Sequence, residues 1–585
     1  MTSQGEYKSS KEAFVSGMSG SSIWHVNLVS FVALSKVATT YPFSLLGEFI
    51  ILAIPLLLSV TVFAESPIWL NIVLLALTAA VCFIFPRKET GTVLPVGASS
   101  PTLGPGASIP SVASIVSGGN TGRSVACPNE IPPLPALTTY RAHMLLLTAI
   151  CILAVDFPVF PRSLAKCETF GVSIMDLGVG SFVFSQGVVS ALPIIKNPTY
   201  LTSPLVPKLT TVLRKCLPLL LLGLLRTVSV KGTEYPEHQT EYGTHWNFFI
   251  TLGLLPLMQV LLHPFMVYLP ISLVGVIVAI SHQLTLSSGG LSVYVLHAPR
   301  TSLVSANKEG LVSLTGYLAI HLMGLSTGTL VLPPSPSYFR RQQESLRKTR
   351  RNTISQPPEM SSLSAGSSSG YQPSSAQYQS HSHSTTTVVP TPASLQEPIK
   401  RENDRTAIEL CSYAVLWWVS LGAMKLLGIG GGVSRRMVNL QYITWVIAYN
   451  TTFILGYLLL DLIFFPSPLS KSVYSPNSGL KVTRSVALGA GSIGPETSAR
   501  QQEGHKTTGS VSSSHGQGGA PMLLEAINKN GLVLFLLANV ATGLINLTIQ
   551  TMYVKDGWAM VILTLYSFAL CAVAWSCRGR KLWRF

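Results

Sequence analysis

Long apolar stretches recur along most of the chain and are separated by shorter polar segments. A membrane-spanning helix needs about 20 predominantly apolar residues. Twelve stretches meet this requirement, at 44–64, 68–85, 141–160, 174–192, 210–230, 247–265, 266–282, 309–332, 406–428, 437–464, 531–553 and 558–577. A thirteenth lies either in the amphipathic stretch Ile23–Tyr41 or in part of 283–300. The pattern therefore predicts an all-α polytopic membrane bundle of about 12–13 transmembrane helices.

Composition supports a membrane protein that forms a single domain over residues 1–585. Of these residues 48% are hydrophobic and only 11% are charged, which is too apolar for a soluble chain of this size. Three interruptions are rich in Ser, Gly, Pro and Thr and have too little apolar surface to offset the entropy of the chain. We expect these three segments, 86–138, 335–403 and 466–521, to be disordered linkers.

The net charge of +16 is concentrated in loops, for example at Arg340–Arg351 and in the tail Arg578–Arg584. Basic loops are typical of the cytoplasmic side of a membrane protein. We therefore expect linkers 335–403 and 466–521 to be cytoplasmic, and we expect no nucleic-acid partner. The eight cysteines include no CxxC pair, so the sequence predicts neither a disulfide framework nor a metal site.

Charged residues are concentrated in the run 152–181, which contains DFPVFPR at 156–162. Ionisable groups in membrane segments are costly to bury and are candidates for function. Two prolines after Asp156 should interrupt the helix and leave a polar pocket in which Asp156 and Lys166 converge. A carboxylate base and a positive group suit acyl transfer to a hydroxyl. The alternative is a structural ion pair that orients two helices.

Further polar residues are candidates for substrate binding. Within the same run these are Arg162 and Asp176, although Asp176 also suits the positive end of the following helix. A second cluster is an aromatic and carboxylate surface that suits a hydroxylated headgroup, or else a solvated loop with interfacial anchors. Its members are His238, Glu241, Tyr242, His245, Trp246 and Asn247. The third cluster has donors that suit a phosphate, or merely meet lipid headgroups, namely Arg300, Asn307 and Lys308.

The sequence contains no HxxxxD acyltransferase box and no Walker loop. The short patterns GxSxG (324–328 and 366–370) and GxGxxG (489–494) do occur, but they lie in a predicted membrane segment and in predicted linkers, without the strand and helix that such motifs require. Soluble-type hydrolase, nucleotidase and dehydrogenase chemistry are therefore disfavoured.

The run 152–185 resembles the GPI-inositol acyltransferase family, known in fungi as GPI-anchored wall transfer proteins. Similar blocks are KEAFVS at 11–16, GSSIW at 20–24, TEYGTHWNFF at 240–249, APRT at 298–301 and NKEG at 307–310. The resemblance covers nearly all of the membrane segments but not the three linkers. It implies a bundle of about thirteen membrane helices with a luminal N-terminus.

The same resemblance implies transfer of a fatty acyl group, usually palmitoyl, from acyl-CoA to the inositol 2-hydroxyl of glucosaminyl phosphatidylinositol. The catalytic aspartate and lysine proposed for the family align with Asp156 and Lys166. Acyl-CoA is then a co-substrate and no cofactor is expected. The expected location is the endoplasmic reticulum membrane, where the partners are the two substrates and membrane lipids, and the oligomeric state stays open.

Two other classes of function are compatible with a polytopic chain. A lipid transporter or flippase also has interrupted helices and charges within the membrane, but it commonly has internal repeats. No convincing similarity relates the two halves of this sequence. The other alternative is a noncatalytic scaffold of GPI assembly, which would tolerate the loss of both Asp156 and Lys166.

Overall fold

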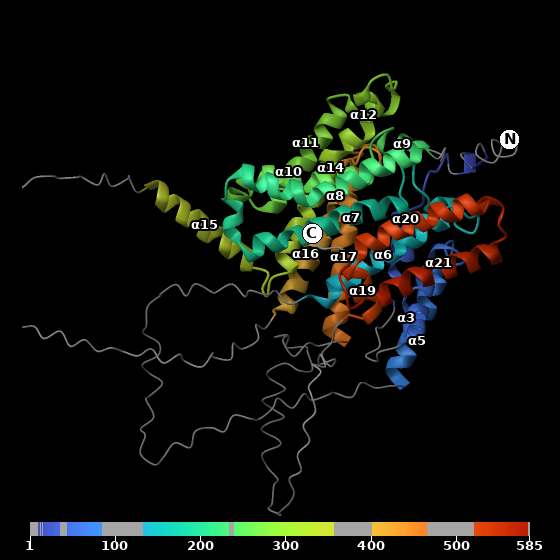
Figure 1. Cartoon of the computed structure of the whole chain (residues 1–585). Coiled ribbons are helices and arrows are strands. Elements are labelled where there is room, and N and C mark those ends of the chain that lie inside the picture. The colour runs from blue at the N-terminus through green and yellow to red at the C-terminus, as the bar shows by residue number, and fades with distance from the viewer. Residues whose placement is uncertain are drawn as a thin grey trace, which may run out of the picture.

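The computed structural model describes residues 10–11, 13–14, 16–35, 44–84, 133–232, 239–355, 401–464 and 520–582. Helices dominate these residues, and the β-type pairing among them is an isolated bridge between Ser21 and Val172. Figure 1 shows the helices packed alongside one another as a bundle. The all-α fold class predicted from the sequence is therefore confirmed.

Eight helices of the described chain are long and apolar enough to cross a membrane. They are α6 (Pro135–Ala154), α7 (Ile174–Lys196), α10 (Phe248–Tyr268), α14 (Lys308–Val331), α16 (Asn403–Leu426), α17 (Leu440–Phe464), α20 (Gly531–Thr548) and α21 (Asp556–Ser576). A ninth span results if α11 (Ile271–Ser287) and α12 (Leu291–His297), which meet at a 64° bend, are counted together. These spans confirm a polytopic membrane bundle.

Shorter or more polar helices complete the described chain. They are α2 (Ile23–Phe31), α3 (Leu45–Leu52), α4 (Ile54–Val60), α5 (Pro67–Ile84), α8 (Leu205–Gly232), α9 (Gln239–Tyr242), α13 (Leu303–Ala306), α15 (Tyr338–Ser355), α19 (Met522–Lys529) and the 3-10 turns η2 (Arg162–Leu164), η3 (Pro198–Leu201) and η4 (Thr551–Tyr553). Each of the twelve predicted apolar segments therefore contains a helix, and so does each of the two candidates for a thirteenth.

Two predicted boundaries are corrected by the structure. The helix predicted over 141–160 is α6, which begins earlier and ends at Ala154, so that Asp156 lies in the loop that follows. The predicted linker 335–403 begins too early, because α15 occupies its first part. This helix is held by polar contacts with the end of α10, where Gln343 donates to the Leu269 carbonyl (3.1 Å) and Arg347 donates to the Val267 carbonyl (2.9 Å). Most residues of the three predicted linkers lie outside the described part of the chain.

Glycines allow α7 and α14 to approach closely in the bundle. A Cβ atom at Gly187 would collide with the His321 carbonyl oxygen, and one at Gly324 would collide with the Phe184 carbonyl oxygen. Small residues at such positions let helix backbones meet where larger side chains would separate them. Most of α14 is buried as a result, which makes it a central helix of the bundle.

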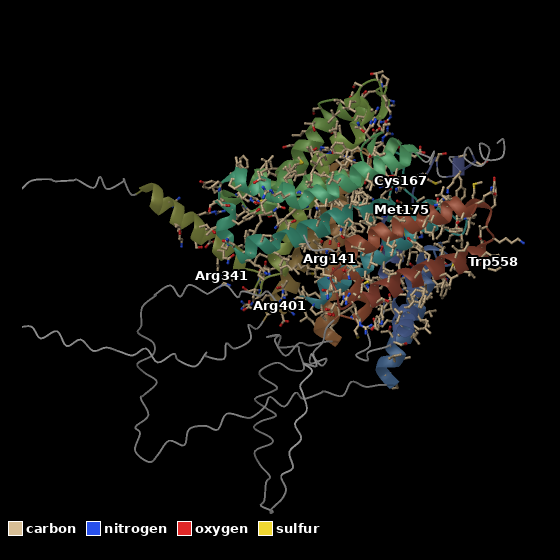
Figure 2. The ribbon with its side chains drawn as sticks, in the orientation of Figure 1. Arg141, Cys167, Met175, Arg341, Arg401 and Trp558 are labelled. Atoms are coloured by element: carbon tan, nitrogen blue, oxygen red, sulfur yellow. The ribbon has the colours of Figure 1, made fainter. Side chains whose placement is uncertain are left out.

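Backbone hydrogen bonds join two pairs of loops at one end of the bundle. The Gly171 amide donates to the Val433 carbonyl (2.8 Å), and the Thr244 amide donates to the Ala306 carbonyl (3.0 Å). These bonds link the loop after α6 to the loop before α17, and the loop before α10 to the loop before α14. In Figure 2, Cys167 and Met175 lie toward this end, and Arg341 and Arg401 lie toward the other. Most of the polar residues that the sequence predicts as functional are therefore gathered at one end.

Candidate functional site

A cavity of about 710 Å³ lies among α6, α7, α8, α10, α17 and α20. Its volume is within the range of about 300–1,000 Å³ that is typical of small-molecule sites. Apolar side chains form much of its wall, among them Met144, Leu147, Ile152, Phe182, Phe535 and Leu547. Charged side chains also line it, namely Asp156, Lys166, Glu168, Arg226, Glu241 and Arg435. Such a cavity suits a ligand that joins a long apolar part to a polar or charged part.

Arg162 shapes the loop that carries Asp156. Its guanidinium donates to the backbone carbonyls of Val155 (2.9 Å), Phe157 (3.0 Å) and Phe160 (2.7 Å). Carbonyls at the end of a helix lack partners within the helix, so these bonds stabilise the turn after α6. Burial lowers the pKa of Arg162 to about 10 although nearby Asp156 acts in the opposite direction. Arg162 does not line the cavity, and these contacts give it a role in holding the loop.

Asp156 is buried and bound by two side chains from distant parts of the sequence. Lys11 Nζ lies 3.3 Å from Asp156 Oδ1, and Asn546 Nδ2 donates to Asp156 Oδ2 at 2.8 Å. Lys11 also donates to Asn546 Oδ1 (2.9 Å), which closes a cluster of three side chains. Lys11 comes from the N-terminal segment and Asn546 from α20. The ion pair that involves Asp156 is therefore made with Lys11 instead of Lys166.

Lys166 begins a chain of charges along the same wall of the cavity. Its Nζ lies 2.9 Å from Glu241 Oε2, and Glu241 Oε1 lies 3.3 Å from Arg435 Nη1. Arg435 Nε in turn lies 2.7 Å from Asp176 Oδ1. The Lys166 side chain is 37% exposed, whereas those of Arg435 and Asp176 are almost fully buried. Asp156 and Lys166 thus line one cavity, but each is held by its own partners.

Asp176 is held at the N-terminus of α7, as its position in the sequence suggested. Its carboxylate accepts hydrogen bonds from the Cys167 amide (2.9 Å) and the Ser173 hydroxyl (2.8 Å). Ser173 is the N-cap residue and accepts a bond from the Asp176 amide (3.1 Å). These contacts join the loop that carries Lys166 to α7. Asp176 is not among the residues that line the cavity, so substrate binding by its carboxylate stays a prediction.

Arg435 enters the site from the loop between α16 and α17. Gly430, Gly431 and Gly432 have positive φ angles, which glycine adopts without strain, and they fold this loop back on itself. The Asn439 side chain then donates to the Gly430 (3.1 Å) and Gly432 (2.6 Å) carbonyls. Burial lowers the pKa of Arg435, but the carboxylates of Glu241 and Asp176 outweigh this effect and hold that pKa well above its ordinary value. Arg435 therefore stays a cation between the two acids.

The second predicted cluster is brought to the cavity in part. Glu241, Tyr242, Trp246 and Asn247 line it, while His245 does not, and His238 lies outside the described residues. Asn247 caps α10 by accepting from the Phe249 (3.1 Å) and Ile250 (3.3 Å) amides. Burial raises the pKa of Tyr242 well above its ordinary value, so its hydroxyl keeps its proton.

The third predicted cluster is not brought to the cavity. Arg300 lies 2.6 Å from Glu309, and Arg436 lies 2.8 Å from the same buried carboxylate. Asn307 accepts from the His245 amide (2.8 Å), and Lys308 donates to the Tyr294 carbonyl (3.3 Å). These contacts tie together the loops before α10, α14 and α17. Phosphate binding by Arg300, Asn307 and Lys308 stays a prediction, and their observed partners are protein groups.

Comparison with known proteins identifies the family of the chain. The GWT1 family model matches residues 7–577. The chain belongs to the GWT1 family. GPI-anchored wall transfer protein 1 of Cryptococcus neoformans var. grubii is 34% identical over 99% of this chain and 100% of that protein. The proteins of the same name from Gibberella zeae and Aspergillus fumigatus are each 33% identical to this chain. The match covers 98% of this chain and of the Gibberella protein, and 97% of this chain and of the Aspergillus protein. The resemblance seen in the sequence motifs is therefore confirmed over nearly the full length.

Sequence reasoning missed several residues that shape the site of this GWT1-family chain. Lys11 appeared only within the family-like block KEAFVS at 11–16, and no motif drew attention to Asn546. Their distance from Asp156 along the sequence hid their contact with it. Arg435 carried a usable signal, because it is a charged residue in a short loop between two apolar segments. Among the described residues, no group of three or more His, Cys, Asp or Glu side chains is placed to hold a metal ion.

Proposed function

We propose that this chain transfers a fatty acyl group from acyl-CoA to the inositol 2-hydroxyl of glucosaminyl phosphatidylinositol. The observation that carries this proposal is that apolar helix faces, Asp156 and Lys166 line the same cavity. Its relatives are named GPI-anchored wall transfer proteins, which supports a role in GPI-anchor biosynthesis and a location in the endoplasmic reticulum membrane. Acyl-CoA acts as a co-substrate, and no cofactor is invoked.

The shape of the cavity suits an acyl chain. Its lining follows one face of α6 from Tyr140 to Ile152, which spans about 18 Å at 1.5 Å per residue. One leaflet of a bilayer, which lipid acyl chains fill, is about 15 Å thick. The lining along α6 is therefore about as long as the acyl chain of a membrane lipid. Tyr140, His143, Tyr449 and Tyr457 line the cavity along the part of α6 remote from Asp156.

Asp156 is the proposed general base. It takes the proton from the inositol hydroxyl while that oxygen attacks the thioester carbonyl carbon. The C–S bond then breaks, and the CoA thiolate takes the proton back from Asp156, so that charge and atoms balance. A carboxylate can accept about four hydrogen bonds, so Asp156 keeps capacity for a hydroxyl beside Lys11 and Asn546.

Lys166 is the proposed positive group opposite the base. Its ammonium has three donors, and the Glu241 carboxylate accepts from one of them at 2.9 Å. Because the side chain is partly exposed in the cavity, other donors can meet the oxygen that becomes negative during attack, or the phosphates of CoA. The pairing with Glu241 holds the ammonium near the cavity wall.

Direct transfer without an acyl-enzyme is supported by the state of a nearby thiol. Cys167 lines the cavity next to Lys166. Burial and the adjacent Asp176 carboxylate raise the pKa of Cys167 well above its ordinary value. A thiol reacts as a nucleophile in its thiolate form, so a raised pKa makes Cys167 a poor nucleophile. The inositol hydroxyl, activated by Asp156, is the better candidate for the attacking group.

Acyl transfer by the purified chain tests the proposal. Labelled palmitoyl-CoA and glucosaminyl phosphatidylinositol are supplied to native protein, to Asp156→Asn and to Lys166→Met. Matched controls are Asp556→Asn and Lys555→Met, which remove the same charges from exposed residues at the start of α21. We expect product from the native chain and both controls, and a loss of about 100-fold or more in the two site variants.

Other results would support different functions. Full activity in the two site variants would contradict the roles of Asp156 and Lys166, although the chain would still be an acyltransferase. A folded native chain that forms no product would contradict the acyltransferase, and movement of the lipid between leaflets would then favour a flippase.

A further inference from the structure

The described residues between Ser10 and Ser22, called here the N-terminal segment, lie along the loop that carries Asp156 and Lys166. The Glu168 amide donates to the Met18 carbonyl (3.3 Å), and the Gly17 amide donates to the Glu168 carboxylate (2.8 Å). The Ser21 amide donates to the Val172 carbonyl (2.7 Å), which forms the isolated β-bridge. These contacts all join residues before α2 to the loop between α6 and α7.

The same segment also contacts the first half of that loop. The Arg162 guanidinium lies 4.1 Å from the centre of the Phe14 ring, and Lys11 forms the ion pair with Asp156. Contacts with N-terminal residues are therefore distributed along the loop from Asp156 to Val172. A segment that only anchored the chain to the bundle would not need a buried charge at one end.

Lys11, Asp156 and Asn546 form a cluster in which donors and acceptors match. The Asn546 amide presents its NH₂ to Asp156 (2.8 Å) and its oxygen to Lys11 (2.9 Å), and the reverse orientation would lose both bonds. Thr551 also donates to the Asn546 oxygen (3.1 Å), which fixes this orientation. The Asp156 carboxylate is thus held by one cation and one oriented amide.

Burial makes this cluster costly if it serves stability alone. The side chains of Lys11 and Asp156 are each 7% exposed. Desolvating two charges offsets much of their attraction, so a buried pair is often no more stabilising than apolar residues of similar size. Asp156 lines the cavity, whereas neither Lys11 nor Asn546 does. The two partners therefore approach the carboxylate from outside the cavity and leave it to be reached from within.

We infer that Lys11 and Asn546 are positioning residues that hold the Asp156 carboxylate, and that the N-terminal segment is part of the acyl-transfer site. The inference rests on the proposed function. Lys11 orients one carboxylate oxygen through the ion pair, and Asn546 fixes the second oxygen through its hydrogen bond. The charged groups around Asp156 are then Lys11 from the N-terminal segment and Arg162 from its own loop, while α20 contributes the neutral Asn546.

The separate effects on kcat and KM distinguish this role from a purely structural one. A carboxylate that is no longer held in place meets the inositol hydroxyl less often in the productive geometry, so kcat falls. Neither Lys11 nor Asn546 lines the cavity, so the KM for palmitoyl-CoA should stay close to the native value. Loss of packing alone would instead lower the thermal melting midpoint.

The experiment compares native full-length protein with Lys11→Met, Lys11→Arg and Asn546→Leu, using palmitoyl-CoA and glucosaminyl phosphatidylinositol over a series of concentrations. We expect Lys11→Met to lower kcat at least about tenfold while KM stays within about twofold of the native value. Lys11→Arg keeps the charge that pairs with Asp156 and should restore much of kcat. Asn546→Leu should lower kcat by a smaller factor.

The outcomes separate this inference from the proposed function. An active native chain whose kcat is unchanged in folded Lys11→Met would overturn the role of Lys11 and leave the acyltransferase standing. A folded native chain with no activity would overturn both. If Lys11→Met does not fold, Lys11→Gln keeps a donor without the charge, and the same fall in kcat is expected. An unchanged kcat in that variant overturns the inference equally.

Discussion

At the scale of single residues, the two proposed catalytic groups are held in different ways. Asp156 is buried between Lys11 and Asn546, whereas Lys166 is partly exposed and bound to Glu241. A fixed carboxylate suits a base that must meet one hydroxyl in one geometry. A lysine on a flexible stem suits an oxygen or phosphate whose position varies between substrates. The separate partners therefore match the separate roles proposed for the two residues.

The Arg435 guanidinium is expected to be essential for the folded site. Arg435→Met leaves Asp176 and Glu241 without their shared cation, and Asp176 is fully buried. Removing one partner from a buried ion pair costs about 3–5 kcal/mol. We expect a marked fall in the thermal melting midpoint of the purified protein.

A matched control for this substitution is Arg405→Met. Arg405 pairs with Glu402 at 3.2 Å, but its side chain is 74% exposed. Exposed pairs contribute about 0–1 kcal/mol, so the melting midpoint should hardly change. Equal midpoints for the two variants would contradict the structural role assigned to Arg435.

Sequence reasoning found the residues of the site better than it found their partners. Asp156, Lys166 and Glu241 stand out because they are charged residues next to apolar segments, and all three line the cavity. Their pairing depends on how distant segments pack, and Asn546 is 390 residues from Asp156 along the chain. No periodicity or spacing rule reaches over that distance, so Lys11 and Asn546 could not be paired with Asp156 from the sequence.

At the scale of elements, close helix packing depends on glycine. At Gly187 on α7, an added methyl group would meet the His321 carbonyl of α14, and a carbonyl cannot move without moving the helix. Gly187→Ala should therefore destabilise the bundle by about 1–3 kcal/mol, less the gain of up to about 1 kcal/mol in helix propensity. A lowered thermal melting midpoint is the expected result.

Gly422 on α16 provides the comparison, because nothing lies within 4 Å of an added Cβ there. Gly422→Ala should leave the midpoint unchanged or raise it slightly. If Gly187→Ala proved as stable as Gly422→Ala, the close packing of α7 against α14 at Gly187 would be contradicted.

The apolar pattern predicted where most helices lie, but it did not predict where they end or where the short polar helices form. Each predicted apolar segment contains a helix because about 20 apolar residues have no other way to bond their backbone in a bilayer. The whole of α15 was missed because its composition is strongly polar. It is held by hydrogen bonds to the carbonyls at the end of α10, which are tertiary contacts.

At the scale of the whole molecule, the charged part of the cavity and α15 lie at opposite ends of the bundle. α10 begins at Phe248, beside the cavity, and ends at Tyr268, beside α15. Figure 1 shows α15 extending away from the bundle on the side opposite α9 and α20. Basic segments are typical of the cytoplasmic side of a membrane protein. If α15 lies in the cytoplasm, we predict that Asp156 and Lys166 face the lumen.

Cysteine labelling in sealed microsomes tests this orientation. Ser345→Cys on α15 and Lys555→Cys before α21 are exposed positions at the two ends. In a chain without its native cysteines, a membrane-impermeant maleimide should label the first site at once and the second only after permeabilisation. Labelling in the reverse order would contradict the orientation and place the charged part of the cavity in the cytoplasm.

Acylation of the inositol ring by this chain can be read from the chemical product. Purified native protein and Asp156→Asn are given palmitoyl-CoA and glucosaminyl phosphatidylinositol, and the lipid is then treated with a phosphatidylinositol-specific phospholipase. An acyl group on the 2-hydroxyl blocks this cleavage. We predict a resistant, palmitoylated lipid from the native chain and a cleavable lipid from Asp156→Asn. A cleavable, unmodified lipid from folded native protein would contradict inositol acylation by this chain.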